Sequence, residues 1–248
     1  MAIREEYERS GGWLFRWRSF LPLLIIPVVF FALKDSQNIE KSFGRNTERA
    51  FEIFAICVSF FGLLIRVIII GSTPKGTSGR NTKHQKAEVL NTNGMYSIVR
   101  HPLYVGNFFI FLGVILFVKV WWFVFIGILL YWLYYERIIF AEEAFLREKF
   151  GDAFMKWAEG TPIIIPDFRK WESPTLTFSP RNVLKREFSG FFGIIASVTA
   201  IRVLENMVID HEIYLSKPWI IFFLAGLAIY LIFYVIKKFT RILKVEGR

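Results

Sequence analysis

The sequence contains very little cysteine: Cys57 is the only one among 248 residues, and it lies inside an apolar run. A single cysteine excludes an intramolecular disulfide, and it excludes cysteine-rich zinc and haem-attachment motifs. The glycine fingerprint of a dinucleotide-binding unit, Gly-x-Gly-x-x-Gly, is also absent. No small-residue cleavage site follows the first apolar run, so we expect this run to be a retained membrane anchor rather than a secretory signal.

Apolar and aromatic residues dominate the composition. Hydrophobic residues make up 54% of the chain, phenylalanine alone occurs 28 times, and the mean hydropathy is +0.42. A soluble domain of this length is less apolar, so lipid is the expected solvent for much of the chain. The net charge of +10 could attract nucleic acid, but the basic residues lie between apolar runs, as in cytoplasmic loops of membrane proteins. We therefore expect no nucleic-acid partner.

Six apolar segments are candidate transmembrane helices, because a bilayer core requires about 20 residues per helix. They are Phe15–Leu33, Phe51–Ile70, Leu103–Val118, Val120–Tyr135, Phe188–Ile209 and Pro218–Ile236. Only Lys119 separates the third from the fourth, and one continuous helix would be about 50 Å long. We therefore predict a short helical hairpin with Lys119 at its tip. The expected fold is an all-α, polytopic integral membrane protein with about six transmembrane helices.

The distribution of basic residues predicts the orientation of this arrangement. Lys and Arg number 23 on one side of the six spans, with Arg16 and Arg18 at the start of the first span counted there, and 6 on the other side, while Arg66 and Arg202 lie inside spans. The positive-inside rule then places both termini, the polar loop 71–93 and the segment 136–187 in the cytoplasm. Within the latter segment, residues 139–158 have the spacing of an amphipathic helix that Gly151 interrupts.

Three regions follow from this organisation. Residues 1–74 hold the N-terminal transmembrane helices, 75–167 hold the candidate site, and 168–248 hold a linker and a C-terminal helix pair. The candidate site begins with Arg100-His101-Pro102, where the third span starts. Taken singly, each residue has a structural explanation, since proline favours a first helical turn and arginine often anchors a helix at the interface. Their concentration with Tyr96 and Tyr104 within fifteen residues indicates a functional cluster.

Acidic and basic residues follow the fourth span and also lie inside the fifth. Glu142-Glu143 is either a solvated acidic pair or a polar part of the site. Arg137 is either a residue that reaches the headgroups or a ligand of an anionic group. Arg202 and Glu205 lie three residues apart inside a span, where charged residues are costly and face a partner or a cavity. They either neutralise each other or take part in function.

Several motifs occur together in one order, and this series resembles the isoprenylcysteine carboxyl methyltransferase family and its relatives among membrane phospholipid methyltransferases. The resemblance covers roughly residues 75–167. The motifs that carry it are Gly94-Met95-Tyr96, Arg100-His101-Pro102-Leu103-Tyr104-Val105-Gly106, Glu142-Glu143, Phe150-Gly151 and the tail with Pro162 and Pro166.

The resemblance implies S-adenosylmethionine as a cofactor, bound at the cytoplasmic ends of the helices without a Rossmann domain. The cofactor contacts that it implies are Leu90, Tyr96, Arg100, His101, Pro102, Leu103, Tyr104, Glu142 and Glu143, with further matches among 88–91 and at Asn81 or Gln85. One position departs from the family pattern: an arginine tied to the substrate corresponds here to Ile138, next to Arg137.

Methyl transfer from a sulfonium is an in-line displacement, so the protein chiefly has to position the reactants and exclude water. No metal is needed. We expect Glu142 to contact the ribose or ammonium of the cofactor, and Arg137 or Arg202 to orient an anionic acceptor. The acceptor would be a lipid or lipid-linked group in the bilayer: a prenylated-cysteine carboxylate, a phosphate or a phospholipid amine.

Two other functions remain open at this stage. One is a membrane reductase of the sterol reductase type with a nicotinamide cofactor, against which the number of spans argues. The other is a non-enzymatic transporter or scaffold that uses Arg202 and Glu205 as a polar pathway, against which the lack of an inverted repeat argues. The sequence does not indicate an oligomeric state.

Overall fold

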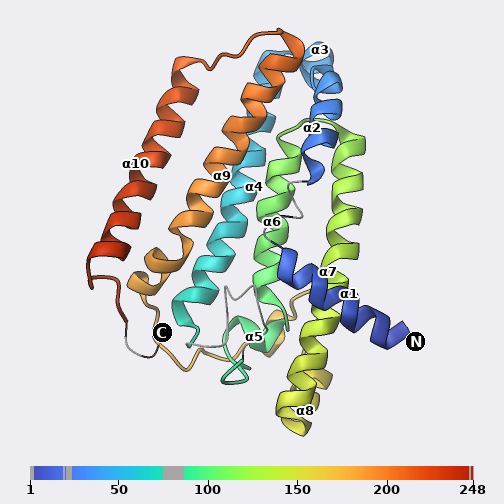
Figure 1. Ribbon diagram of the computed structural model, residues 1–248, viewed down its shortest axis with the longest axis vertical. Coiled ribbons are helices and arrows are strands. Elements are labelled where there is room, and N and C mark those ends of the chain that lie inside the picture. Colours follow the sequence, from blue (N-terminus) through green and yellow to red (C-terminus); the bar gives the residue numbers. More distant parts are fainter. Residues whose placement is uncertain (1–2, 19, 21–23, 75–86, 246, 248) are drawn as a thin grey trace.

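The computed structural model describes residues 3–18, 20, 24–74, 87–245 and 247. Within these residues it contains helices and one isolated β-bridge (Figure 1). The helices are α1 (Ile3–Trp17), α2 (Ile26–Ala32), η2 (Leu33–Asp35), α3 (Asn38–Phe43), α4 (Arg45–Ser72), α5 (Met95–Ile98), α6 (Pro102–Leu116), α7 (Trp121–Phe150), α8 (Asp152–Gly160), η3 (Phe168–Lys170), α9 (Pro180–Ile209) and α10 (Lys217–Phe239).

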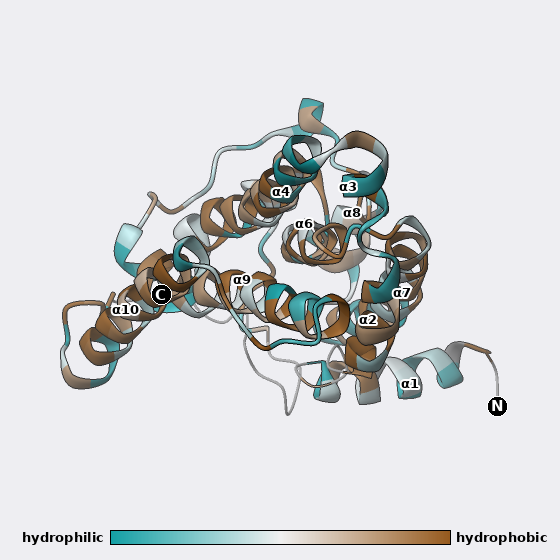
Figure 2. Ribbon diagram, turned by 90° about the horizontal axis from the view of Figure 1, so that it is seen from above, coloured by the Kyte–Doolittle hydropathy of each residue, from teal (hydrophilic) through white to brown (hydrophobic). Residues whose placement is uncertain are grey.

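Among the described residues, four helices are long and apolar enough to cross a membrane: α4, α7, α9 and α10. The apolar helix α6 has only 15 residues. These five helices coincide with five of the six predicted spans, and the prediction of an all-α polytopic membrane protein is confirmed. Figure 2 shows α4, α6, α7 and α9 grouped together, with α10 beside α9 at one edge.

The prediction of a first continuous span over 15–33 is wrong. Helix α1 ends at Trp17, and α2 begins at Ile26 with Pro27 in its first turn and contains only seven residues. Proline lacks the amide that an uninterrupted helix would need at this point, whereas a first turn tolerates it. Helix α1 lies across α7 instead of running along the bundle (Figure 1). Gly11 fits closely there, because a Cβ at this position would be 2.1 Å from the carbonyl oxygen of Arg137.

Helices α4 and α6 approach each other closely along a seam of small residues. A Cβ on Gly62 would lie 2.5 Å from the carbonyl oxygen of Gly106, and one on Gly113 would lie 2.4 Å from that of Ala55. Within the seam, the Ser59 hydroxyl donates to the carbonyl of Ile110 over 3.0 Å. Such small-residue seams are typical of helix packing in lipid, where van der Waals contact replaces the hydrophobic effect.

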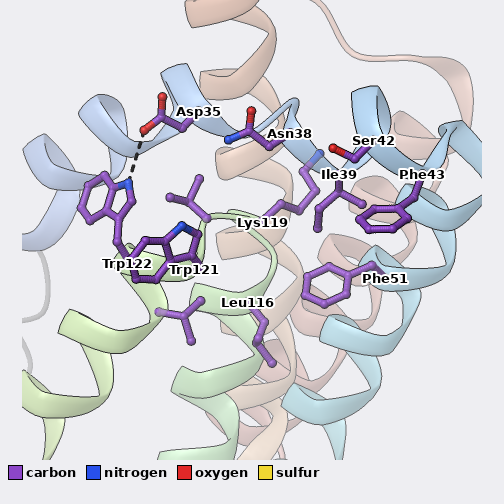
Figure 3. Close-up of a pocket in the computed structure, with 12 residues that line it drawn as sticks. Asp35, Asn38, Ile39, Ser42, Phe43, Phe51, Leu116, Lys119, Trp121 and Trp122 are labelled. Atoms are coloured by element: carbon purple, nitrogen blue, oxygen red, sulfur yellow. Dashed lines mark hydrogen bonds between the residues drawn. The ribbon is translucent and has the colours of Figure 1, made fainter.

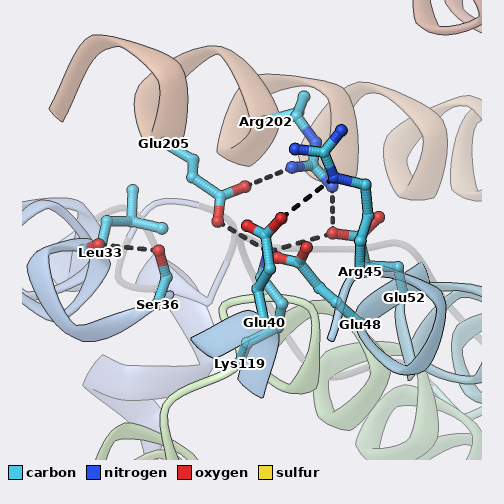
Figure 4. Close-up of polar contacts among 9 residues, drawn as sticks. All are labelled: Leu33, Ser36, Glu40, Arg45, Glu48, Glu52, Lys119, Arg202 and Glu205. Atoms are coloured by element: carbon cyan, nitrogen blue, oxygen red, sulfur yellow. Dashed lines mark hydrogen bonds and ion pairs between the residues drawn. The ribbon is translucent and has the colours of Figure 1, made fainter. Parts of the chain in front are cut away.

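The turn between α6 and α7 lies at Lys119, as predicted, and Lys119 adopts a left-handed conformation with φ of 65°. Its side chain is not an exposed tip, because only 5% of the residue is accessible. The ammonium forms ion pairs with Glu48, Glu52 and Glu205. Arg202 pairs with the last two of these carboxylates (Figure 4). This buried group, which we call the Lys119 cluster, joins α4, α9 and the hairpin turn at one end of the bundle.

Helix α7 is longer than predicted, since it continues through the fourth span into the predicted amphipathic segment. Gly151, with φ of 53°, ends α7 and separates it from α8. The interruption at Gly151 therefore agrees with the sequence prediction. Because α7 is unbroken until this point, it carries Glu142 and Glu143 past the apolar part of the bundle to the end that lies opposite the Lys119 cluster.

Candidate functional site

The candidate site lies where α5, the first turn of α6 and the last third of α7 meet. His101 precedes α6 with a non-helical backbone (φ −122°, ψ 59°), and Pro102 occupies the first turn, which needs no amide donor there. The chain before it is held by the segment after α8: the Arg100 amide donates to the carbonyl of Pro162 over 2.8 Å, and the Asp167 amide donates to that of Ile98 over 2.9 Å. The tail with the two prolines thus fixes the motif at the helix entrance.

The two glutamates of α7 contact Arg100 and His101 of the Arg-His-Pro motif and Tyr104 in the first turn of α6. Arg100 donates to Glu143 over 2.9 Å, and His101 Nε2 lies 3.0 Å from the other oxygen of the same carboxylate. Tyr104 donates its hydroxyl to Glu142 over 2.8 Å, and His101 Nδ1 lies 3.6 Å from that carboxylate. The structure therefore brings together five of the residues that the sequence singled out.

Aromatic rings line the site from α5, α6 and α7. The Tyr104 ring stacks on His101 with centroids 5.6 Å apart, and its other neighbour, Tyr135, lies 4.8 Å away. Tyr96, in α5, has its carbonyl bound by the indole of Trp157 over 3.2 Å. Burial raises the pKa of the Tyr96 hydroxyl well above its usual range, and the negative charge of Glu142 raises this pKa further. Tyr96 therefore remains a protonated hydrogen-bond donor at neutral pH.

A second polar group, which the sequence prediction missed, adjoins this site. Arg66 of α4 forms two 2.8 Å bonds with Glu187 of α9 and donates to Asn107 of α6 over 2.6 Å. The Asn107 amide in turn donates to the Tyr135 hydroxyl over 3.4 Å. The signal was the charge of Arg66 inside a span, which requires a partner, but nothing in the local spacing identified Glu187.

Arg100 also has a donor without a partner. Its Nε is buried and makes no hydrogen bond within the described part of the chain. A buried polar group left unpaired costs about 1–3 kcal/mol, so a ligand acceptor at this position would remove a real penalty. The same site contains His101 and Tyr96 as further donors and Glu142 as an acceptor. A ligand that carries both a carboxylate and hydroxyl or ammonium groups matches this set.

Comparison with known proteins shows a similarity to methyltransferases in the region that contains the site. Residues 52–153 match the model of the phospholipid methyltransferase family. These residues are less than half of the chain, and we call them the methyltransferase-like core because of this similarity. The chain is also similar to the Protein-S-isoprenylcysteine O-methyltransferase of Schizosaccharomyces pombe, with 34% identity over 85 residues, which are 34% of this chain and 36% of the relative. The chain thus matches about a third of the length of that relative. No solved structure matches.

The methyltransferase-like core runs from α4 to the start of α8, so it includes Tyr96, the Arg-His-Pro motif and both glutamates. The resemblance predicted from these motifs is confirmed. Glu187 and Arg202, on α9, lie outside the core, as does α1.

Two predicted site residues do not join this cluster. Arg137 faces α1, where it contacts Ser10 over 3.4 Å and lies 5.0 Å from the centre of the Tyr7 ring. Arg202 belongs to the Lys119 cluster at the other end of the bundle (Figure 4). The acceptor-orienting role expected for either of them therefore has no support from its position. Ile138, at the departing position, is fully buried.

The remaining predicted contacts lie in the chain just before the motif or at the start of α6. Pro102 and Leu103 open α6, and Leu90 is half-buried in the segment before α5. Glu88 is exposed in that same segment. Asn81 and Gln85, the two upstream alternatives, lie outside the described residues.

Proposed function

We propose that this protein is an S-adenosylmethionine-dependent methyltransferase that acts on a lipid or lipid-linked acceptor in the membrane. The observation that carries the proposal is the convergence of Arg100, His101 and Tyr104 on Glu142 and Glu143, within a region that matches the phospholipid methyltransferase family. In this reading the five side chains form the polar wall of a cofactor pocket at one end of the bundle.

The donors and acceptors of this wall fit the cofactor. The unpaired Nε of Arg100 and the imidazole of His101 would hold the carboxylate of S-adenosylmethionine. Glu142 would accept from a ribose hydroxyl or the ammonium group. The faces of Tyr96 and Tyr104 would attract the sulfonium by a cation–π interaction. When bound, the cofactor supplies an activated methyl group, and the protein's own residues position it and exclude water.

The acceptor would reach the site from the bilayer. Helix α6 has 15 residues, about 22 Å in length, which is shorter than a hydrocarbon core of about 30 Å. Its first turn therefore lies within reach of lipid headgroups, and Tyr104 and Tyr135 next to it are only half-buried. The fission yeast relative is named for methylation of isoprenylcysteine, and the matching family for phospholipids. A prenylcysteine carboxylate and a phospholipid amine are the first acceptors to test, followed by a lipid-linked phosphate.

The charge distribution favours a cytoplasmic site. The C-terminus lies at the same end of the bundle as α5 and α8 (Figure 1). A cytoplasmic position would give the pocket access to the soluble cofactor. The orientation can be tested with a cysteine introduced at Glu148 in a Cys57→Ser background. If this end faces the cytoplasm, an impermeant thiol reagent outside intact cells should not label this cysteine, whereas the same reagent should label it in lysed cells. Labelling in intact cells would contradict the orientation.

The cofactor assignment can be tested by titration calorimetry of the detergent-purified protein. Glu142→Ala removes an acceptor whose hydrogen bonds to a charged or polar ligand are worth about 1.5–3 kcal/mol, so we expect at least about tenfold weaker binding of S-adenosylmethionine. Glu148→Ala is the matched control, because Glu148 is exposed on the same helix. Equal affinities of the two variants for S-adenosylmethionine would show that Glu142 does not contact the cofactor. Binding of NADPH instead of S-adenosylmethionine would favour a reductase.

The acceptor assignment requires a separate experiment. Membranes with and without the protein are incubated with S-adenosylmethionine that carries a radiolabelled methyl group, and the lipid and protein products are separated. Label in the lipid fraction indicates a phospholipid or lipid-phosphate acceptor, and base-labile label in the protein fraction indicates a prenylcysteine carboxylate. Absence of protein-dependent label from both fractions would contradict the proposed activity.

A further inference from the structure

A separate cavity lies at the end of the bundle opposite the candidate site. Its volume is about 670 Å³, and it is bounded by α3, the start of α4 and the α6–α7 hairpin (Figure 3). From Trp121, which borders it, α7 runs about 30 Å to Glu142 at 1.5 Å per residue. This distance equals the thickness of a hydrocarbon core, so the cavity lies at the opposite membrane interface. It cannot be part of the cofactor pocket.

The lining of this cavity is divided into a polar and an apolar part. Asp35, Asn38 and Ser42 border it from the η2–α3 segment, and Leu116, Val124 and Phe51 border it from the helices that cross the membrane. Trp121 is 80% exposed, and tryptophan concentrates where hydrocarbon meets headgroups. A ligand that matches this lining must be amphipathic, with its polar end beneath α3 and its apolar end along the helices.

The polar groups of the cavity offer both kinds of hydrogen bond. Asn38 and Ser42 lie one helical turn apart, and their side chains make no hydrogen bond to other described residues, so both can donate to a ligand. Asp35 accepts only from the indole of Trp122, at 3.3 Å, which leaves acceptor capacity on its carboxylate. Amide and hydroxyl donors suit a phosphate, while the carboxylate suits a cation.

The charges around the cavity favour a ligand that carries a cation over one that is purely anionic. Lys119 borders the cavity, but three carboxylates surround its ammonium and its side chain is fully buried, so it is not available to a phosphate. Asp35 and Lys119 are the charged residues that line the cavity, and the ammonium of Lys119 is already paired, so Asp35 supplies the charge that is available to a ligand. A headgroup that carries an ammonium therefore matches this lining better than a purely anionic one.

We propose that this cavity binds the headgroup of a zwitterionic phospholipid from the leaflet opposite the candidate site. The ammonium lies beside Asp35 and the exposed indole of Trp121, whose ring face attracts cations. The phosphate accepts from Asn38 and Ser42, and the acyl chains follow Leu116 and Val124. The bound lipid joins α3 to the hairpin turn. This site is independent of methyl transfer and would exist whatever the acceptor of the methyl group.

Native mass spectrometry of the full-length protein, titrated with dimyristoyl lipids, tests the proposal. We expect phosphatidylcholine and phosphatidylethanolamine to bind about tenfold more tightly than phosphatidylglycerol, a difference that a cation–π contact and a carboxylate can supply. A preference for phosphatidylethanolamine would place its ammonium on Asp35 through hydrogen bonds, and equal binding of the two zwitterionic lipids would place the cation on the indole face of Trp121.

Three variants separate a specific site from ordinary lipid contact. Asp35→Asn should abolish the preference over phosphatidylglycerol, while Glu212→Gln, an exposed acid in the α9–α10 connection at the same end, should keep it. Asn38→Ala/Ser42→Ala leaves the Asp35–Trp122 bond intact and should weaken both zwitterionic lipids several-fold. Equal binding of all three lipids to the wild type, or unchanged binding to both Asp35→Asn and the double variant, would overturn the proposal.

Discussion

Tyr104 donates its phenolic hydrogen to Glu142 over 2.8 Å while its ring stacks on His101. One side chain thus joins the entrance of α6 to the distant end of α7, 38 residues later in the chain. Because His101 contacts both glutamates, the orientation of the acidic pair and that of the motif depend on each other. If the site binds S-adenosylmethionine as proposed, the hydroxyl of Tyr104 sets the direction in which Glu142 presents its oxygens.

Tyr104→Phe should weaken cofactor binding without removing the aromatic wall. The change deletes a hydrogen bond to a carboxylate, worth about 1.5–3 kcal/mol, and keeps the ring that stacks on His101. We expect the affinity for S-adenosylmethionine in calorimetry to fall about tenfold. Tyr134→Phe is the control, because its hydroxyl bonds to the Leu14 carbonyl on α1. A loss of equal size in both variants would mean that Glu142 does not depend on Tyr104.

Gly106→Ala should destabilise the contact between α4 and α6. A Cβ at this position would lie 2.7 Å from Cγ of Arg66 and 3.0 Å from the Gly62 carbonyl oxygen, so the Arg66–Glu187 pair would have to shift. Overpacking of this kind costs about 1–3 kcal/mol. Gly193→Ala is the control, since a Cβ there meets nothing within 4 Å. Thermal unfolding in detergent should show a lower midpoint for the first variant alone, and equal midpoints would contradict the close packing.

Lys119→Met should destabilise the protein while leaving its cofactor site intact. It removes a cation that three glutamates share, and an uncompensated buried charge costs about 3–5 kcal/mol. The Lys119 cluster lies at the end of the bundle opposite Glu142, so we expect a lower unfolding midpoint but an unchanged affinity for S-adenosylmethionine in the protein that remains folded. A matching loss of affinity would show that the two ends of the bundle are coupled.

Much of this organisation could be predicted because it is encoded locally. Five spans follow from continuous apolar runs, and the break at Gly151 follows from its interruption of a helical pattern. The convergence of Arg100, His101 and Tyr104 with the acidic pair was inferred from motif order. The charge of Lys119 between two apolar runs was enough to locate a turn, although its burial depends on carboxylates from α4 and α9, which lie far away in the chain.

The features that sequence reasoning missed depend on tertiary contacts. The hydropathy pattern predicted one span that included the end of α1 and all of α2. In the structure α1 packs across α7, and a separate helix begins near Pro27. Arg66 and Glu187 are 121 residues apart, so no local spacing could pair them. Arg202 was placed near the acceptor because a charge inside a span suggests function, but the structure gives it carboxylate partners at the far end.

Tyr96 should make the stability of the protein depend on alkaline pH in a defined direction. Burial and the charge of Glu142 raise the pKa of its hydroxyl above the value of about 10 in an unfolded chain. Below about pH 10 both states bind the proton, and its contribution to stability is constant. Above that pH the unfolded chain ionises first, so the contribution is lost as pH rises toward the folded pKa. The stability of the wild type relative to Tyr96→Phe should therefore be flat up to about pH 9 and decline above about pH 10.

Thermal unfolding of the wild type and of Tyr96→Phe across this pH range measures the difference in stability. The contributions of the other tyrosines cancel in this difference. A difference that stays flat beyond pH 10 would mean that the phenol ionises as easily in the folded protein as in the unfolded chain, and that neither burial nor Glu142 acts on the Tyr96 hydroxyl.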